Sequence, residues 1–103
     1  MKKCTNPPKF PLGEIDYTHG VLEASNDWGW LKTCLNRHSH GDWGNIGDEA
    51  KAENEDSLIN GLSLISAYPI DPTKPCNGHD ENSFWIITHP SRTSTTILLP
   101  YER

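Results

Sequence analysis

The chain has 103 residues, which is the length of one ordinary domain and excludes a multidomain enzyme. Fourteen acidic residues outnumber nine Lys and Arg, and the net charge of −5 argues against direct nucleic-acid binding, which relies on clustered basic residues. The sequence has no apolar run of membrane-spanning length and no secretory signal at its start, so we expect a cytoplasmic protein that makes no membrane contact.

Proline dominates the start of the chain. Three prolines fix the backbone and remove hydrogen-bond donors, so residues 1–12 are predicted to form an extended N-terminal arm. Residues 13–103 are then the single domain. Its first elements are a short strand over 13–17, indicated by alternating apolar and polar residues, and one helical turn at 21–24.

Two longer helices are expected next. Apolar side chains recur with helical spacing after Asp27, a favoured N-cap residue, and predict a helix over 27–38. Acidic residues followed by good helix formers predict a second helix over 48–60, which Gly61 ends at its C-terminal cap. The apolar residues expected to turn inward from this second helix are Leu58, Ile59 and Leu62.

The second half of the chain predicts a sheet. Three runs rich in β-branched and aromatic residues, at 62–68, 84–88 and 94–99, indicate three strands that pair antiparallel. A turn-rich segment over 71–82 separates the first two, and a tight turn at 89–92 separates the last two. The predicted fold is α+β: a three- to four-stranded antiparallel sheet with two helices packed on one face and the N-terminal strand near an edge.

High-specificity catalytic motifs are absent from the sequence. The three cysteines, Cys4, Cys34 and Cys76, include no C-x-x-C pair, so neither a disulfide framework nor a cysteine zinc site is indicated. Nucleophile elbows and glycine-rich phosphate loops are missing as well. We therefore predict no catalytic residue and no cofactor.

One short segment, His38-Ser39-His40-Gly41-Asp42, is similar to the H-x-H-x-D start of the metallo-β-lactamase zinc motif. The match ends there, because Trp43 stands where a further His is needed. On a helix, two imidazoles two residues apart also point about 200° apart. His38, His40 and Asp42 are therefore only weak metal candidates, and we predict no structural metal. For His38 the alternative is a capping or core role.

Residues 38–45 and the acidic helix after them are the predicted partner-binding region. Trp43 lies between glycines, where it either pins the loop onto the core or offers its face to a partner. The helix acids form either a solvated face or a contact for a basic partner. Arg92 occupies either a solvated turn or an anion contact. The candidate partner-binding residues are Asp42, Trp43, Asn45, Glu49, Glu53, Asp56 and Arg92.

A wider pattern extends over most of the chain. It comprises His38, Gly41-Asp42-Trp43-Gly44, Glu53-Asn54-Glu55, Gly61, Leu64–Tyr68, Trp85–Thr88, Arg92, Thr95-Thr96 and Leu98-Leu99-Pro100. The pattern resembles a family of roughly hundred-residue proteins carried by plasmids, phages and their bacterial hosts, described as plasmid-related proteins or as type I restriction endonuclease subunit M. The resemblance implies a mobile-element accessory protein. A methyltransferase is excluded, because the chain cannot hold the Rossmann-like sheet that the cofactor needs.

Size, acidity, the missing catalytic motifs and the resemblance lead to two hypotheses. The first is a non-enzymatic binding protein that contacts a host protein with a basic surface, as a defence-system inhibitor of the anti-restriction or anti-CRISPR type. The second is a small-ligand or nucleotide-binding protein that uses Trp43 and Arg92, with weak metal-assisted hydrolysis by His38, His40 and Asp42. The sequence leaves the oligomeric state open.

Overall fold

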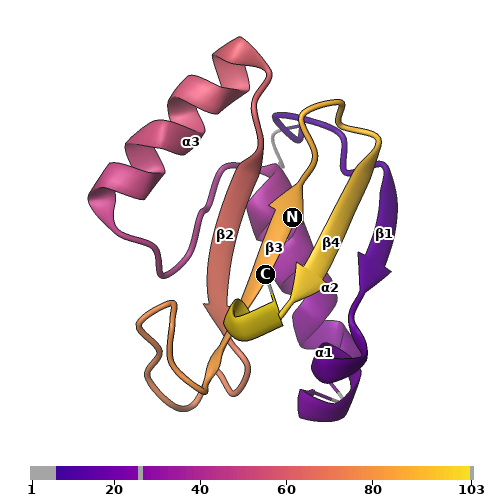
Figure 1. Cartoon of the computed structure of the whole chain (residues 1–103), viewed down its shortest axis with the longest axis vertical. Coiled ribbons are helices and arrows are strands. Elements are labelled where there is room, and N and C mark those ends of the chain that lie inside the picture. The colour runs from indigo at the N-terminus through magenta and orange to yellow at the C-terminus, as the bar shows by residue number, and fades with distance from the viewer. Residues whose placement is uncertain (1–6, 26, 103) are drawn as a thin grey trace, which may run out of the picture.

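A computed structural model describes residues 7–25 and 27–102 of the chain (Figure 1). The described residues form an α+β fold, so the predicted class is confirmed. The elements in chain order are β1 (Glu14–Tyr17), α1 (His19–Ala24), α2 (Trp28–Ser39), α3 (Asp48–Asn60), β2 (Leu64–Pro69), β3 (Ser83–Thr88), β4 (Ser94–Leu98) and the 3-10 turn η1 (Pro100–Glu102).

The strands form one sheet in the order β1-β4-β3-β2. The last three strands of the chain pair antiparallel, as the sequence predicts, and β1 lies at an edge. However, β1 runs parallel to β4, so the sheet is mixed and not purely antiparallel. The reason is the connection: β1 and β2 run in the same direction at opposite edges, and the helices between them supply the crossover that such strands require.

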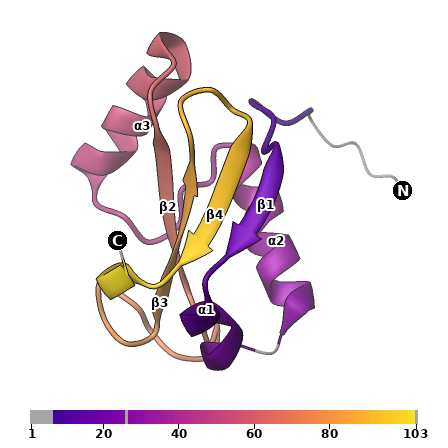
Figure 2. The same cartoon turned by 45° about the vertical axis from the view of Figure 1, so that its right-hand side comes forward.

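The helices take different positions on this sheet. The helix α2 lies on one face of the sheet (Figure 2), and Val21 of α1 packs into the same core cluster as Leu31 and Cys34 of α2. As predicted, α2 begins at Asp27, whose carboxylate accepts a hydrogen bond from the Trp30 N–H at 2.9 Å. In contrast, α3 lies beside the outer edge of β2 (Figure 1). None of the described helices has the length and apolar composition that crossing a membrane requires.

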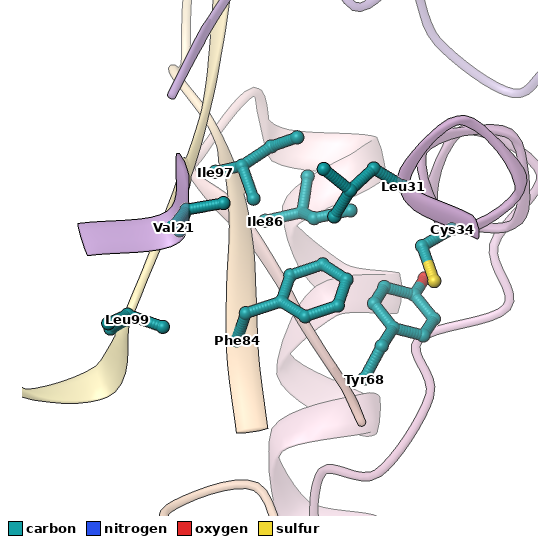
Figure 3. Close-up of a cluster of buried hydrophobic side chains, with 8 residues drawn as sticks. All are labelled: Val21, Leu31, Cys34, Tyr68, Phe84, Ile86, Ile97 and Leu99. Atoms are coloured by element: carbon teal, nitrogen blue, oxygen red, sulfur yellow. The ribbon is translucent and has the colours of Figure 1, made fainter. Parts of the chain in front are cut away.

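The main core lies between the sheet and the two helices on its covered face. Alternate residues of the strands point into it, as the period of two in a strand demands. Figure 3 shows these side chains converging from both layers. The buried members are Val21, Leu31, Cys34, Tyr68, Phe84, Ile86, Ile97 and Leu99. Burial raises the pKa of the Cys34 thiol to about 12, so this cysteine is a core residue and a poor nucleophile.

A second core cluster involves the N-terminal arm. Phe10 is buried and its ring stacks on Trp43, with 6.2 Å between the ring centroids. The Lys9 N–H donates to the Ser39 carbonyl at 2.7 Å. The described part of the arm is therefore docked on the domain, because one buried aromatic ring outweighs the donors that the prolines remove. Residues 1–6 of the predicted arm lie outside the described residues.

The opposite face of the sheet is open over its centre. In Figures 1 and 2, no α-helix of the described chain lies over β3 and β4 on this face. Because strand residues alternate, this face carries Trp85, Ile87, Thr96 and Leu98. One face of the sheet thus builds the core, and the other has no α-helix of the described chain over β3 and β4.

The docked arm predicts a stability effect. Phe10→Ala should lower the free energy of unfolding by about 3 kcal/mol, because it removes a buried ring and leaves a cavity beside Trp43. Urea denaturation measures the change. Lys9→Ala is the matched control, since that side chain is exposed, and should change stability by less than about 0.5 kcal/mol. If the arm only trails from the domain, the two variants should have the same free energy of unfolding.

Candidate functional site

The acidic helix α3 is attached to the sheet by polar side chains and by Leu58, which packs against the cluster of Phe10, Trp43 and Leu64. Its buried residues are Asn54 and Ser57. The Asn54 side-chain N–H donates to the Ile65 carbonyl at 2.7 Å, and the Ile65 N–H donates to the Asn54 side-chain oxygen at 3.2 Å. The amide therefore pairs with the edge of β2 as the backbone of a further strand would. The helix ends as predicted, with Gly61 in the left-handed conformation.

Arg92 fastens the other end of α3. Its Nη1 donates to the Leu62 carbonyl at 2.7 Å and its Nη2 to the Ser57 carbonyl at 3.1 Å, so it satisfies carbonyls at the helix C-terminus. The guanidinium also bonds to the carbonyls of His89 and Pro90 in its own turn. Arg92 thus ties the β3–β4 turn to α3, which is a structural role that neither sequence interpretation included.

The loop before α3 covers a further part of the β2 edge. The Ala67 N–H donates to the Trp43 carbonyl at 3.3 Å, and the Asn45 N–H donates to the Ala67 carbonyl at 2.7 Å. Gly44 permits this contact, because its φ is +72° and a Cβ there would collide with the Ala67 carbonyl oxygen. The loop is therefore held by backbone pairing.

Trp43 belongs to the core. Only 4% of its surface is exposed, its ring packs against Phe10 and His38, and its Nε1–H donates to Glu55 Oε2 at 2.8 Å. The sequence leaves two interpretations of Trp43 open, and the structure shows the one in which the ring pins the loop onto the core. The ring offers no face to a partner, so any apolar anchor on this surface has to come from other residues.

A buried chain of hydrogen bonds runs across the covered face of the sheet. His38 is fully buried, and its Nδ1 bonds to the Ser66 hydroxyl. Its Nε2 lies 2.9 Å from Thr88 Oγ1, which lies 2.8 Å from Thr95 Oγ1. The Thr95 hydroxyl donates to the Leu12 carbonyl at 2.7 Å. The chain therefore links all three antiparallel strands, α2 and the arm.

The terminal carbonyl sets the direction of every bond in this chain. Leu12 can only accept, so the single Thr95 proton is used there and Thr88 must donate to Thr95. Thr88 then accepts from His38, which places the imidazole proton on Nε2. Nδ1 is left as an acceptor for Ser66. One neutral tautomer of His38 therefore satisfies the whole chain, in agreement with the predicted core role.

The same chain contains a serine–histidine pair, the combination that hydrolases use as nucleophile and base. Both Ser66 and His38 have no exposed surface, so a substrate cannot reach the hydroxyl. Burial, with a smaller contribution from the charge of Arg92, lowers the pKa of His38 to about 3. The pair is thus a structural device in this fold.

The weak metal candidates lie apart. The nitrogens of His38 are taken by hydroxyls, and His40 Nδ1 lies 2.7 Å from the Asn36 carbonyl oxygen. Asp42 accepts from Arg37 Nε at 2.8 Å, and this guanidinium holds the pKa of the carboxyl below its usual range. Among the described residues, no group of three or more His, Cys, Asp or Glu could hold a metal ion.

The outward surface of α3 brings three predicted site residues together. Glu49, Glu53 and Asp56 are exposed and line one shallow groove that Leu62 borders. Of the three residues expected to turn inward, Leu58 does so and packs against the Phe10, Trp43 and Leu64 cluster. The expectation is wrong for Ile59 and Leu62, which are 83% and 52% exposed. The helix turns Asn54 and Ser57 toward the sheet, so part of its apolar surface faces outward.

A cavity lies on the other flank of α3, against the open face of the sheet. It has a volume of about 210 Å³. Two predicted residues, Asn45 and Glu53, line it together with the strand residues Ile65 and Trp85 and the backbone of Gly78. The structure therefore places Glu53 between two surface features, the groove and this cavity.

Sequence reasoning missed Trp85 and Asn54 as site-forming residues. The strand pattern contains a signal for Trp85: if Phe84 and Ile86 face the core, the ring between them must lie on the opposite face. No comparable signal exists for Asn54, since an amide in an acidic helix predicts only a solvated residue. Comparison of the chain with protein-family models, with curated proteins and with solved structures finds no match.

The buried imidazole predicts acid sensitivity. The pKa of His38 is about 3 in the folded protein and about 6.5 when unfolded, so the unfolded state binds the proton more tightly. Stability should therefore fall by about 1.4 kcal/mol per pH unit as the pH drops below about 6.5. Denaturant unfolding between pH 7 and about 4.5 measures this slope.

Two histidine variants provide the control for the dependence of stability on pH. His38→Gln should be less stable at neutral pH and should lose the slope, because Gln carries no titrating proton. His19→Gln, on an 83% exposed side chain, should keep the wild-type slope. A wild-type unfolding free energy that stays flat across the same pH range would contradict the neutral buried imidazole.

Proposed function

We propose that the protein is a non-enzymatic binding protein that makes a stoichiometric contact with a host protein through the outward surface of α3. The observation that carries this proposal is the groove of Glu49, Glu53 and Asp56, which exposed Leu62 borders, on a helix that also exposes Ile59. Protein interfaces combine a few apolar anchors with a polar rim, and this surface offers both. Ile59 and Leu62 take the anchoring role that the buried Trp43 cannot.

Charge indicates the kind of partner. Five acids and one lysine give α3 a net charge of −4 within a chain of net charge −5; they are Asp48, Glu49, Glu53, Glu55, Asp56 and Lys51. Charges on a surface act over about 8 Å at physiological salt, so this field is local to the helix. It favours fast association with a basic protein surface.

The placement of the polar core residues supports a role without catalysis. Ser66 and His38 are closed to substrates, and the Cys34 thiol is buried. The alternative, nucleotide binding through Trp43 and Arg92, draws no support from their positions: the ring is inside and the guanidinium is engaged by carbonyls. The acids on α3 would also repel phosphate groups.

The resemblance to plasmid- and phage-borne proteins supports a more specific proposal. The protein is a mobile-element accessory that inhibits a host defence component of the restriction or CRISPR kind. Such components hold nucleic acid through basic surfaces, and a basic surface is what the acidic groove complements. One inhibitor would then occupy part of the nucleic-acid path of one effector.

Affinity capture with charge-reversed variants tests the proposal. Tagged wild-type protein should retain a specific basic protein from host lysate, and the doubly substituted Glu49→Lys/Asp56→Lys protein should lose it. Capture by the wild type should weaken as salt rises, because the attraction is electrostatic. Both proteins should melt within a few degrees of each other, since the substituted side chains are exposed.

The matched control reverses two acids on the opposite edge of the sheet. Glu14→Lys/Asp16→Lys makes the same change in net charge on β1 and should leave capture intact. If the α3 variant captures the same protein as the wild type, α3 is not the contact surface and the proposal is wrong. The same conclusion follows if both variants lose it equally, since total charge would then explain the binding.

A further inference from the structure

The outer edge of β1 is a free sheet edge. In Figure 1, β1 borders the right-hand side of the molecule, and among the described strands it pairs with β4 alone. The Glu14 N–H donates to the Thr93 carbonyl at 2.9 Å, so the backbone of Glu14 faces β4. Since backbone groups alternate along a strand, the N–H and carbonyl groups of Ile15 and Tyr17 point away from β4. A further strand could bond to these groups.

The side chains of β1 divide between the two faces of the sheet. Ile15 and Tyr17 are in register with two buried residues of β4, so they lie on the face that α2 covers. Glu14 and Asp16 therefore lie on the open face, and both are exposed. On the open face, the free edge is thus lined by two negative charges.

On the face that α2 covers, the same edge carries two aromatic rings. The Tyr17 ring contacts the ring of Trp28 at the start of α2, with 5.0 Å between the centroids. The two residues remain 43% and 46% exposed. Exposed Trp and Tyr are typical of contact surfaces, because each offers a large apolar area on a stiff side chain. A strand added to β1 would place its side chains on this face beside Tyr17.

Charge makes a second copy of the chain a poor occupant of this edge. When two β1 strands pair antiparallel about a two-fold axis, their open faces lie on the same side of the joined sheet. Each register that pairs the strands then sets Glu14 or Asp16 of one copy opposite an acid of the other. Like charges directly opposite destabilise a strand pair, and opposite charges stabilise it. The acids therefore protect the edge from self-association and favour a basic strand.

We propose that β1 binds an extended basic segment of a partner protein as a fifth strand of the sheet. In this segment, lysine or arginine opposite Glu14 and Asp16 alternates with β-branched or aromatic residues beside Tyr17. The backbone bonds provide affinity, and the alternation provides specificity. This partner is a different protein from the one at α3, which lies beside β2 at the opposite edge of the sheet.

Titration with a synthetic peptide tests the proposal. An acetylated heptapeptide that alternates lysine and valine is added to the protein and followed by NMR. It should bind about ten-fold or more tightly than a scrambled peptide of the same composition, because only the alternating peptide has one basic and one apolar face as a strand. In the complex, the amides of Ile15 and Tyr17 should become protected from exchange, whereas the Asp16 amide, which faces β4, should change little.

Removal of the two negative charges provides a second comparison. Glu14→Gln/Asp16→Asn should weaken binding of the alternating peptide about five-fold or more, because the amides keep the size of the side chains and lose their charge. Glu49→Gln/Asp56→Asn is the matched control on α3. It should keep the wild-type affinity within about two-fold, because salt screens charges at the far edge of the sheet.

Three outcomes would overturn the proposal. They are equal binding of the two peptides or none of either, no protection of the two outward-facing amides of β1, and an unchanged affinity in Glu14→Gln/Asp16→Asn. The proposal about α3 fails separately. A protein held at β1 should be lost by Glu14→Lys/Asp16→Lys and kept by Glu49→Lys/Asp56→Lys, which is the reverse of the result expected for the α3 partner.

Discussion

The side-chain amide of Asn54 closes the edge of β2 by accepting from the N–H of Ile65 and donating to its carbonyl. Because this pairing is polar, α3 needs few apolar residues to stay on the sheet. Its remaining surface is free to carry acids and to leave Ile59 exposed. In an ordinary amphipathic helix, the apolar residues pack against the core and are not exposed. The acidic groove and the cavity flanking α3 both depend on this mode of attachment.

Polar contacts also hold the rest of the small domain together. Arg92 joins the end of α3 to the β3–β4 turn, and the hydrogen-bond chain through His38 joins the strands to α2 and to the arm. A buried polar group costs stability unless it is paired, and the neutral tautomer of His38 leaves none of this chain unpaired. Ser66 and His38 thereby serve the structure, whereas the acids of α3 lie on the surface.

The local elements were predictable from sequence because their signals are local. Asp27 and Gly61 mark helix ends through their own backbone preferences, and the strands follow from β-branched runs. The parallel pairing of β1 was not predictable, since it depends on how the helices return the chain across the sheet. The outward turn of Ile59 was missed for a related reason: the buried side of α3 is set by the bonds between Asn54 and Ile65 of the following strand, with Leu58 beside them, and the apolar character of Ile59 gives no sign of this.

Amide hydrogen exchange on the wild type and on Asn54→Ala tests the central claim, that the Asn54 amide holds α3 in place. The Ile65 amide should be protected in the wild type about as well as the Ala67 amide, which donates to the Trp43 carbonyl. In the variant, Ile65 and the amides of α3 should exchange faster while those of the central strand β3 keep their protection. Rapid exchange of Ile65 in the wild type, or unchanged protection of α3 in the variant, would contradict the account.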